Sequence, residues 1–222
     1  MMSDTVKKAI AGIATVTLLY VAYVGSYLPL RKSQAYIATL RNMGNVRSID
    51  EFKNAFQAVF DIQSPIGQEE LVRNMANTIV SIINNQQVNP SIIEPLVQFA
   101  EDSFRPIITS DRGMSFSQNL YVMANIHQAA FLRTNDTRHL AAARIYYEWG
   151  EKRGPERPQF LYGLFDIYRM QGDVAGVHRI SEKILSLWPT DDGVRKAVEQ
   201  FDTEYAAHQK AASSTAKKAG TK

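Results

Sequence analysis

Apolar residues recur every three to four positions through most of the chain, which is the spacing of an amphipathic helix. Between Pro155 and Pro189 this pattern runs on both sides of a short break at Gln171–Asp173. The apolar positions there are Leu161, Leu164, Phe165 and Tyr168 before the break, and Val174, Val177, Ile180, Ile184, Leu187 and Trp188 after it. Two such helices joined by a three-residue turn predict an antiparallel helical hairpin.

The two prolines that bound this hairpin are 34 residues apart, which is the period of the tetratricopeptide repeat. Small, aromatic and proline residues also fall at the positions this repeat favours: Ala143, Tyr147 and Pro155 in one unit, and Tyr168, Gly172, Val177 and Pro189 in the next. We therefore expect an all-α protein with a tetratricopeptide-like, right-handed helical repeat (α-solenoid) domain. The helices before Ser115 do not keep the period and are interpreted as degenerate repeats or a helical cap.

Local signals place helices through the rest of the domain. Ser48–Glu51 reads as a capping box, in which Ser48 accepts from the Glu51 amide and Glu51 returns a bond to the Ser48 amide. Asn89 and Pro90 are typical of a helix start. The helices expected on this basis cover residues 48–62, 68–86, from 89 onward, 116–132, 138–152 and 191–208. No segment shows the alternation of a strand.

Residues Ala9–Leu30 contain no charged side chain and predict a transmembrane helix, because about 20 apolar residues span a bilayer. Tyr20, Tyr23 and Tyr27 gather toward its C-terminal end, where phenol rings suit the membrane interface. The run is too long for a signal-peptide core and lacks a good cleavage site, so we favour a retained anchor. A cleaved signal peptide and a buried soluble helix are the alternatives. Basic residues flank both ends, which leaves the side of the following domain open.

These patterns divide the chain into four parts. Residues 1–30 form a leader and a single transmembrane helix, and residues 31–47 a juxtamembrane helix and linker. Residues 48–208 form the helical repeat domain. Residues 209–222 are small, polar and basic, and we expect them to be a disordered tail.

The charge and composition of the chain limit the kinds of partner and chemical site that it can have. The four lysines of the tail account for more than the whole net charge of +3, so the rest of the chain is close to neutral. A nucleic-acid-binding surface is therefore not expected. The absence of cysteine excludes disulfides, thiolate metal sites and cysteine nucleophiles.

Two stretches, together with the terminal span, carry a resemblance to a known family. F-D-I-Q-S-P-I-G-Q-E-E-L-V-R at 60–73 and G-P-E-R-P-Q-F-L-Y-G-L-F-D-I-Y-R-M-Q-G-D at 154–173 resemble the tetratricopeptide-like tail of bacterial O-antigen ligase-like membrane proteins. That family has a polytopic membrane body, which holds its glycan-transfer chemistry, whereas this chain has one span. The resemblance therefore implies an anchored module near cell-envelope glycan assembly, or a noncatalytic tail or subunit of a ligase or polymerase, and no catalytic residue.

The residues themselves show no catalytic arrangement. His127, His139, His178 and His208 lie in different expected helices without metal-ligand spacing. His127 falls on an apolar face, so we expect it to occupy a hydrogen-bonded core position and not to bind a metal. Adjacent acidic pairs at helix starts are explained by the helix dipole. The glycines form no phosphate-binding loop. We therefore expect a non-enzyme with no cofactor and no metal.

Aromatic and arginine residues in the last two hairpins give the one candidate binding surface. Most of these aromatics are expected to form the core between stacked helices. Five side chains fall off the main apolar faces and could line a groove: Arg144, Tyr146, Arg153, Arg157 and Tyr162. Repeat scaffolds bind extended peptides in such grooves, and arginines favour an acidic segment or a terminal carboxylate. The predicted function is a membrane-anchored scaffold that binds a protein partner.

Overall fold

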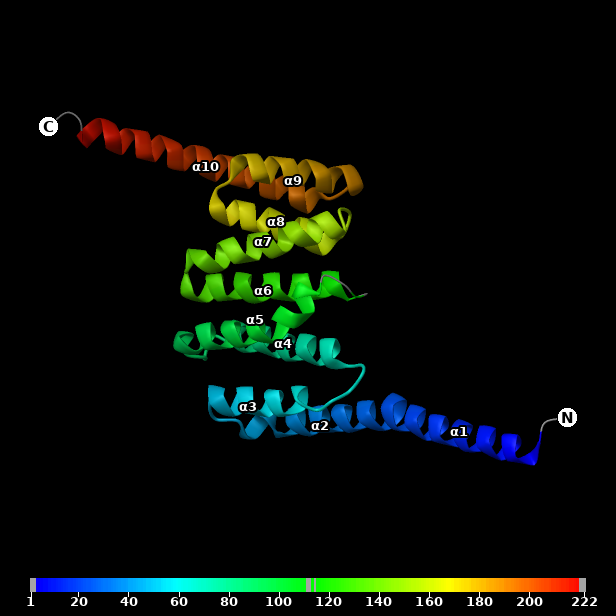
Figure 1. Cartoon of the computed structure of the whole chain (residues 1–222). Coiled ribbons are helices and arrows are strands. Elements are labelled where there is room, and N and C mark those ends of the chain that lie inside the picture. Colours follow the sequence, from blue (N-terminus) through cyan, green and yellow to red (C-terminus); the bar gives the residue numbers. More distant parts are fainter. Residues whose placement is uncertain (1–2, 111–112, 114, 220–222) are drawn as a thin grey trace. The chain divides into compact units, whose positions relative to one another are not determined.

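The computed structural model describes residues 3–110, 113 and 115–219, with the backbone alone for 212–219. Every regular element in this described part is a helix, which confirms the all-α prediction. The chain divides into two compact units, residues 1–115 and 116–222. Figure 1 shows the helices of each unit.

Unit 1 begins with one continuous helix. It consists of α1 (Asp4–Ala22), a single π-helical turn η1 (Tyr23–Tyr27) and α2 (Leu28–Asn42), and it ends in a 3-10 turn at Met43–Asn45. In the π turn the Leu28 N–H donates to the Tyr23 carbonyl, five residues back. Pro29 follows directly, and its ring would clash with the carbonyl four residues earlier in a regular helix. The wider turn accommodates it.

The N-terminal part of this helix is apolar and unburied. Ile13, Val16, Leu18 and Leu19 are each 66–69% exposed. Its length and composition are those of a membrane-crossing helix, and it is the one such helix among the described residues. A helix in the core of a soluble protein would be buried, and this one is not.

Three further helices complete unit 1: α3 (Ile49–Phe60), α4 (Gln68–Asn84) and α5 (Ile93–Thr109), the last preceded by a 3-10 turn at Pro90–Ile92. The side chains that pack between them are apolar and fully or nearly fully buried: Phe52, Phe56, Val59, Met75, Ile79, Ile83, Ile93, Leu96 and Phe104. Helix α2 packs on α3, where Tyr36 meets Phe56 with ring centroids 6.3 Å apart.

The expected capping box at the start of α3 forms with one difference. Ser48 Oγ accepts a hydrogen bond from the Glu51 amide at 3.1 Å, as predicted. The Glu51 carboxylate in turn accepts a hydrogen bond from the Arg47 amide, at 2.7 Å, and not from the Ser48 amide. The Glu51 carboxylate thereby fixes the linker one residue further upstream.

A buried lysine ties α2 to the connection between α3 and α4. Lys32 is 3% exposed, and its ammonium donates to the carbonyls of Phe60 at 3.3 Å and Ile62 at 2.8 Å and to the side-chain oxygen of Gln68. Burial lowers the pKa of Lys32, and nearby Asp61 opposes that shift. These three acceptors replace the water molecules that the ammonium group loses on burial.

Unit 2 contains α6 (Phe116–Thr134), α7 (Thr137–Arg153), α8 (Pro158–Gln171), α9 (Val174–Leu187) and α10 (Asp192–Ala219). Each helix contacts the next along the chain. The hairpin predicted between Pro155 and Pro189 is α8 and α9, and Gly172 closes α8 in the left-handed conformation at φ 66°. Asp173 caps α9 by accepting from the Gly176 amide at 2.9 Å.

Glycines and aromatic rings interlock α7 with α8. A Cβ atom at Gly163 of α8 would lie 2.3 Å from the Tyr147 ring of α7, and one at Gly150 of α7 would lie 2.0 Å from the Phe160 ring of α8. Both rings are almost fully buried. Each helix therefore presents a ring that fills the space above a glycine of the other.

Helix α10 is longer than the sequence indicated. It continues to Ala219, whereas a disordered tail was expected from residue 209. Ala211, Ala212, Ala216 and Ala219 explain the difference, because alanine is the strongest helix former. Residues 220–222 and the side chains of Lys217 and Lys218 lie outside the described part. The predicted basic surface of the tail therefore stays a prediction.

Replacing Gly163 by alanine is expected to destabilise unit 2. Overpacking against Tyr147 costs up to about 3 kcal/mol, and the better helix propensity of alanine returns about 1 kcal/mol, so the net loss is up to about 2 kcal/mol. Thermal unfolding of the full chain in detergent, followed by circular dichroism, measures it. Gly44→Ala is the matched control, because a Cβ there meets no atom within 4 Å. Equal stability of the two variants would contradict the interlock.

Replacing Lys32 by methionine keeps the aliphatic stem and removes the ammonium. The carbonyls of Phe60 and Ile62 would then lose a buried donor, which costs about 1–3 kcal/mol. Limited proteolysis in the connection at 61–67 is expected to become faster. The neighbouring exposed residue supplies the control, since Arg31→Met should leave the cleavage rate near that of the parent. An unchanged rate in Lys32→Met would show that the three bonds do not hold this connection.

Candidate functional site

The five predicted partner-binding residues all lie in α7 and α8 or their connection. Arg144, Tyr146 and Arg153 belong to α7, Arg157 is the N-cap residue of α8, and Tyr162 lies in its second turn. Arg153 and Arg157 are exposed, and the other three are half-buried. Their intramolecular contacts decide how each side chain is presented.

Arg144 is held by acidic and amide groups on three sides. Its guanidinium donates to Glu148 at 2.8 Å within α7, to Gln171 at 3.0 Å and to Asp173 at 3.4 Å. It also lies over the Tyr168 ring, 4.7 Å from the centroid. The hydrogen bond that Arg144 donates to Glu148 raises the pKa of Arg144. This arginine therefore connects α7 to the end of α8 and the start of α9.

Tyr168 is the centre of a wider polar network. Its buried hydroxyl donates to Glu148 at 3.1 Å and accepts from Arg179 of α9 at 2.8 Å. Arg179 lies over the same ring. We call Arg144, Glu148, Glu151, Tyr168, Arg179 and Lys183 the Tyr168 network. Burial raises the pKa of the Tyr168 hydroxyl, so it stays neutral and can donate.

Glu151 extends the network from α7 to α9. It accepts from Lys183 at 2.7 Å and forms an ion pair with Arg179 at 3.7 Å. Glu151 is only 16% exposed, whereas Lys183 and Arg179 reach solvent at 31% and 54%. The basic ends of the network are thus the parts that an external group can contact.

The remaining predicted residues contact other neighbours. Tyr146 stacks on His127 of α6, with ring centroids 5.6 Å apart, and Arg153 lies over Phe116 at 5.3 Å. Tyr162 donates to Asp191 and stacks on Trp188. The bond to Asp191 raises the pKa of Tyr162 to about 12.

The structure thus gives four of the five side chains different contacts and leaves Arg157 exposed at the start of α8. Arg144 faces α8 and α9, Tyr146 and Arg153 face α6, and Tyr162 faces the connection between α9 and α10. Their role in binding a partner stays a prediction. The network around Tyr168 was missed from the sequence, because Glu151, Arg179 and Lys183 belong to separate helices and share no motif.

His127 and His139 form a buried pair in the α6–α7 hairpin. Their Nδ1 atoms are 3.3 Å apart, and both side chains are at most 5% exposed. Burial, and then the neighbouring His139, lower the pKa of His127 to about 4. The prediction that His127 occupies a hydrogen-bonded core position is confirmed. Two rings that approach through their nitrogens cannot both be protonated without repulsion.

Stability is therefore expected to depend on pH through His127. Its folded-state pKa lies below the ordinary value near 6.5, so the unfolded chain binds the proton first as the pH falls. The free energy of unfolding should decrease between about pH 6.5 and pH 4, by up to about 3 kcal/mol. Denaturant titrations across this range measure the slope. His127→Asn should flatten it and His208→Asn, an exposed control on α10, should not; equal slopes would refute this assignment.

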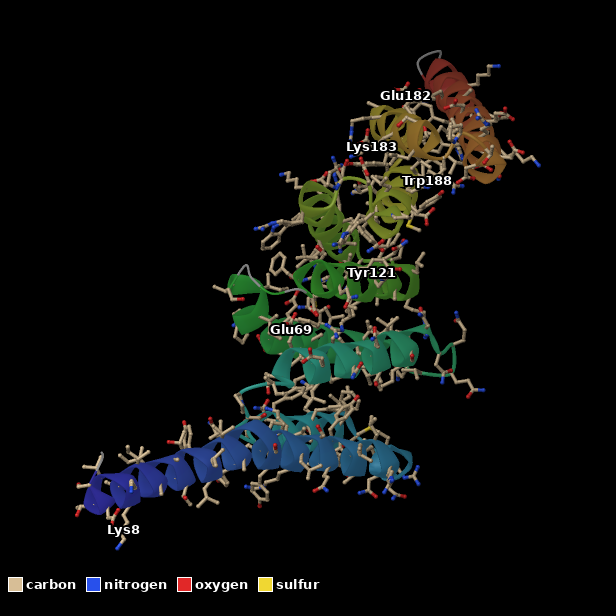
Figure 2. All side chains as sticks on the ribbon, turned by 90° about the vertical axis from the view of Figure 1, so that its right-hand side faces the viewer. Lys8, Glu69, Tyr121, Glu182, Lys183 and Trp188 are labelled. Atoms are coloured by element: carbon tan, nitrogen blue, oxygen red, sulfur yellow. The ribbon has the colours of Figure 1, made fainter. Side chains whose placement is uncertain are left out.

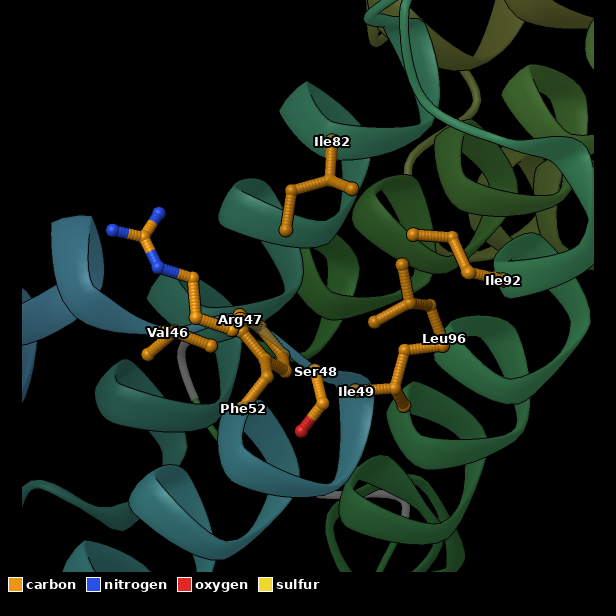
Figure 3. Close-up of a pocket in the computed structure, with 8 residues that line it drawn as sticks. All are labelled: Val46, Arg47, Ser48, Ile49, Phe52, Ile82, Ile92 and Leu96. Carbon is orange, nitrogen blue, oxygen red and sulfur yellow. The ribbon is translucent and has the colours of Figure 1, made fainter.

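Unit 1 contains a small apolar cavity of about 260 Å³ (Figure 3). It is lined by Ile49, Phe52, Ile82, Ile92 and Leu96, together with Val46, Arg47 and Ser48. The lining comes from α3, α4, α5, the 3-10 turn before α5 and the linker before α3. Figure 3 shows the aliphatic side chains pointing toward a common space, with the Arg47 guanidinium directed away from it.

No group of three or more histidine, aspartate or glutamate side chains in the described residues is placed to hold a metal ion. Comparisons with protein-family models, with curated proteins and with solved structures found no match to this chain. The functional argument therefore rests on the chain's own residues.

Proposed function

We propose that this chain is a single-pass membrane protein whose helical repeat domain binds another protein. The observation that carries the proposal is the N-terminal helix, in which Ile13, Val16, Leu18 and Leu19 are each 66–69% exposed, whereas the helices that follow it bury most of their large apolar residues. Placing Ala9–Leu30 in a bilayer removes this apolar surface from water. The span then fixes the location of the helical domain and raises its local concentration near a membrane-bound partner.

Packing in unit 2 supports a tetratricopeptide-like repeat. Helices α7 and α9 end 34 residues apart, at Arg153 and Leu187. Residues at this spacing also share their environment: Ala143 and Val177 are fully buried, and Tyr147 and Ser181 are 1% and 4% exposed. Equivalent burial at the repeat period is what stacked hairpins require.

The basic side chains on this unit indicate the chemistry of the partner. Arg153 and Arg157 are exposed around the start of α8, and Arg179 and Lys183 reach solvent from α9. Arginine binds carboxylates through paired donors. An acidic segment or a chain-terminal carboxylate is therefore the ligand class that this surface favours.

A second candidate is a noncatalytic tail or subunit of an O-antigen ligase or polymerase. The resemblance of the hairpin at 154–173 to the tails of O-antigen ligase-like proteins favours it, and the partner would then be a polytopic glycan-transfer protein. Both candidates assign binding to the helical domain and leave the chemistry to another chain. They differ in the identity of that chain.

Site-specific photocrosslinking in intact membranes tests the proposal. A photoreactive residue in place of exposed Glu156, between Arg153 and Arg157, is expected to give an adduct with one protein. The same residue in place of Glu199 on α10 is the control and should give none. The double change Arg153→Glu, Arg157→Glu should lower the adduct yield several-fold, whereas Lys196→Glu on α10 should not.

Mass spectrometry of the adduct separates the two candidates. A polytopic membrane protein of glycan assembly supports the ligase subunit, and any other partner supports a scaffold of different purpose. Absence of an adduct at Glu156, combined with hydrolase or transferase turnover by the purified chain, would overturn both.

A further inference from the structure

The connection between α3 and α4, residues 61–67, is fixed beside the C-terminal end of the candidate span. Lys32 holds it there through the carbonyls of Phe60 and Ile62 and the side chain of Gln68. Lys32 is only two residues beyond Leu30, the end of the apolar run. This clamp places the connection at the level where the chain would leave the membrane.

A second contact region joins the connection to the long helix at the same level. A hollow of about 450 Å³ is lined by Tyr23, Leu28 and Arg31 from the long helix and by Ala58 and the residues Asp61, Ile62 and Gln63 from the α3 side. Tyr23 and Tyr27 stack with ring centroids 5.4 Å apart on the same helix turn. Tyrosine prefers the interface between lipid tails and water. The start of the connection thus lies beside the tyrosines expected to mark that interface.

The connection presents an apolar side chain to its surroundings. Ile66 is 64% exposed, and Pro65 beside it is exposed as well. Ser64 Oγ donates to the Ile66 carbonyl at 2.7 Å, and Gly67 turns the chain at φ 93°. These features hold a compact turn with Ile66 outward, while every other large apolar side chain of α3 and α4 is buried or half-buried.

Figure 1 shows this connection, in cyan, bowing toward the side on which α1 extends from α2. Figure 2 gives the view along the perpendicular direction, where the connection again lies next to the long helix. Helix α4 then runs away from it for 17 residues, about 25 Å, so that its far end lies well away from the connection.

We infer that the 61–67 connection is a second membrane contact, in which Ile66 enters the headgroup layer of the bilayer that holds α1. This rests on the proposed span. The occupant is lipid, because the connection continues the apolar and tyrosine-bearing surface of the span and because Arg31, exposed in the same hollow, suits lipid phosphate. The bonds of Lys32 then help to set the tilt of unit 1 against the membrane, since a second contact beside the span resists tilting of the domain relative to the bilayer plane.

The chain contains no cysteine, so a single introduced cysteine is the only thiol and can be labelled specifically. The full-length variants Ile66→Cys, Leu18→Cys and Gln86→Cys carry an environment-sensitive nitrobenzoxadiazole probe. Gln86 is the matched control, being an exposed residue of the turn at the other end of α4. The proteins are reconstituted in vesicles of phosphatidylcholine and phosphatidylglycerol, with iodide on both sides as the aqueous quencher. Headgroup-nitroxide lipids report direct lipid contact.

The expected result is graded. The Ile66 probe should be quenched by iodide several-fold less than the Gln86 probe, emit at shorter wavelength and be quenched by headgroup-nitroxide lipid. The Leu18 probe should be protected from iodide most strongly. An Ile66 probe as accessible as that at Gln86, with Leu18 protected, overturns the second contact and leaves the span intact.

Two other results are also decisive. An Ile66 probe that is protected from iodide but insensitive to nitroxide lipid is covered by protein, which overturns the lipid contact. A Leu18 probe freely quenched by iodide overturns the span itself, and the inference with it.

Discussion

The reciprocal seating of two aromatic rings on two glycines is the constraint on which unit 2 depends. Tyr147 and Phe160 can be buried between α7 and α8 only because Gly163 and Gly150 leave no side chain beneath them. The same device recurs where Tyr168 of α8 covers Gly176 of α9, with a Cβ there only 2.7 Å from the ring. The ring of Tyr168 thus sets the helix spacing while its hydroxyl organises the charges of Glu148 and Arg179. Core packing and surface charge are consequently coupled through one side chain.

In unit 1 the contact between α2 and α3 depends on a buried cation and not on small residues. Lys32 lies on the face of α2 that meets α3, and backbone carbonyls at the end of α3 satisfy it. An apolar residue would pack there as well, but it would not bind those carbonyls. The interaction thereby selects one arrangement of the long helix against the body of unit 1. As the proposed membrane anchor, a helix joined to its domain by such a contact would be a rigid connection and not a flexible tether.

The sequence predicted the elements that obey regular periodicity or capping rules. The hairpin at Gln171–Asp173 and the cap at Ser48 follow from spacing and residue type alone. Lys32 could not be found in this way, because a lysine after an apolar run reads as a solvent-exposed membrane flank, and its partners are about 30 residues distant. The five candidate binding residues were chosen by their position on helix faces. Their partners, such as Asp191 for Tyr162 and Asp173 for Arg144, come from connections whose placement depends on tertiary packing.

The π turn at Tyr23–Tyr27 has a consequence for the surface of the long helix. One extra residue in a turn rotates all following side chains by about 100° about the helix axis. Counting back from Lys32 and Tyr36 at regular α-helical spacing therefore does not identify the residues of α1 that lie on the same side of the long helix. In the proposed membrane arrangement, the α1 face toward lipid and the α2 face toward the domain are therefore offset from each other by this phase shift. Under that proposal, substitutions in the apolar run would change contacts within the bilayer and leave the packing of α2 on α3 unchanged.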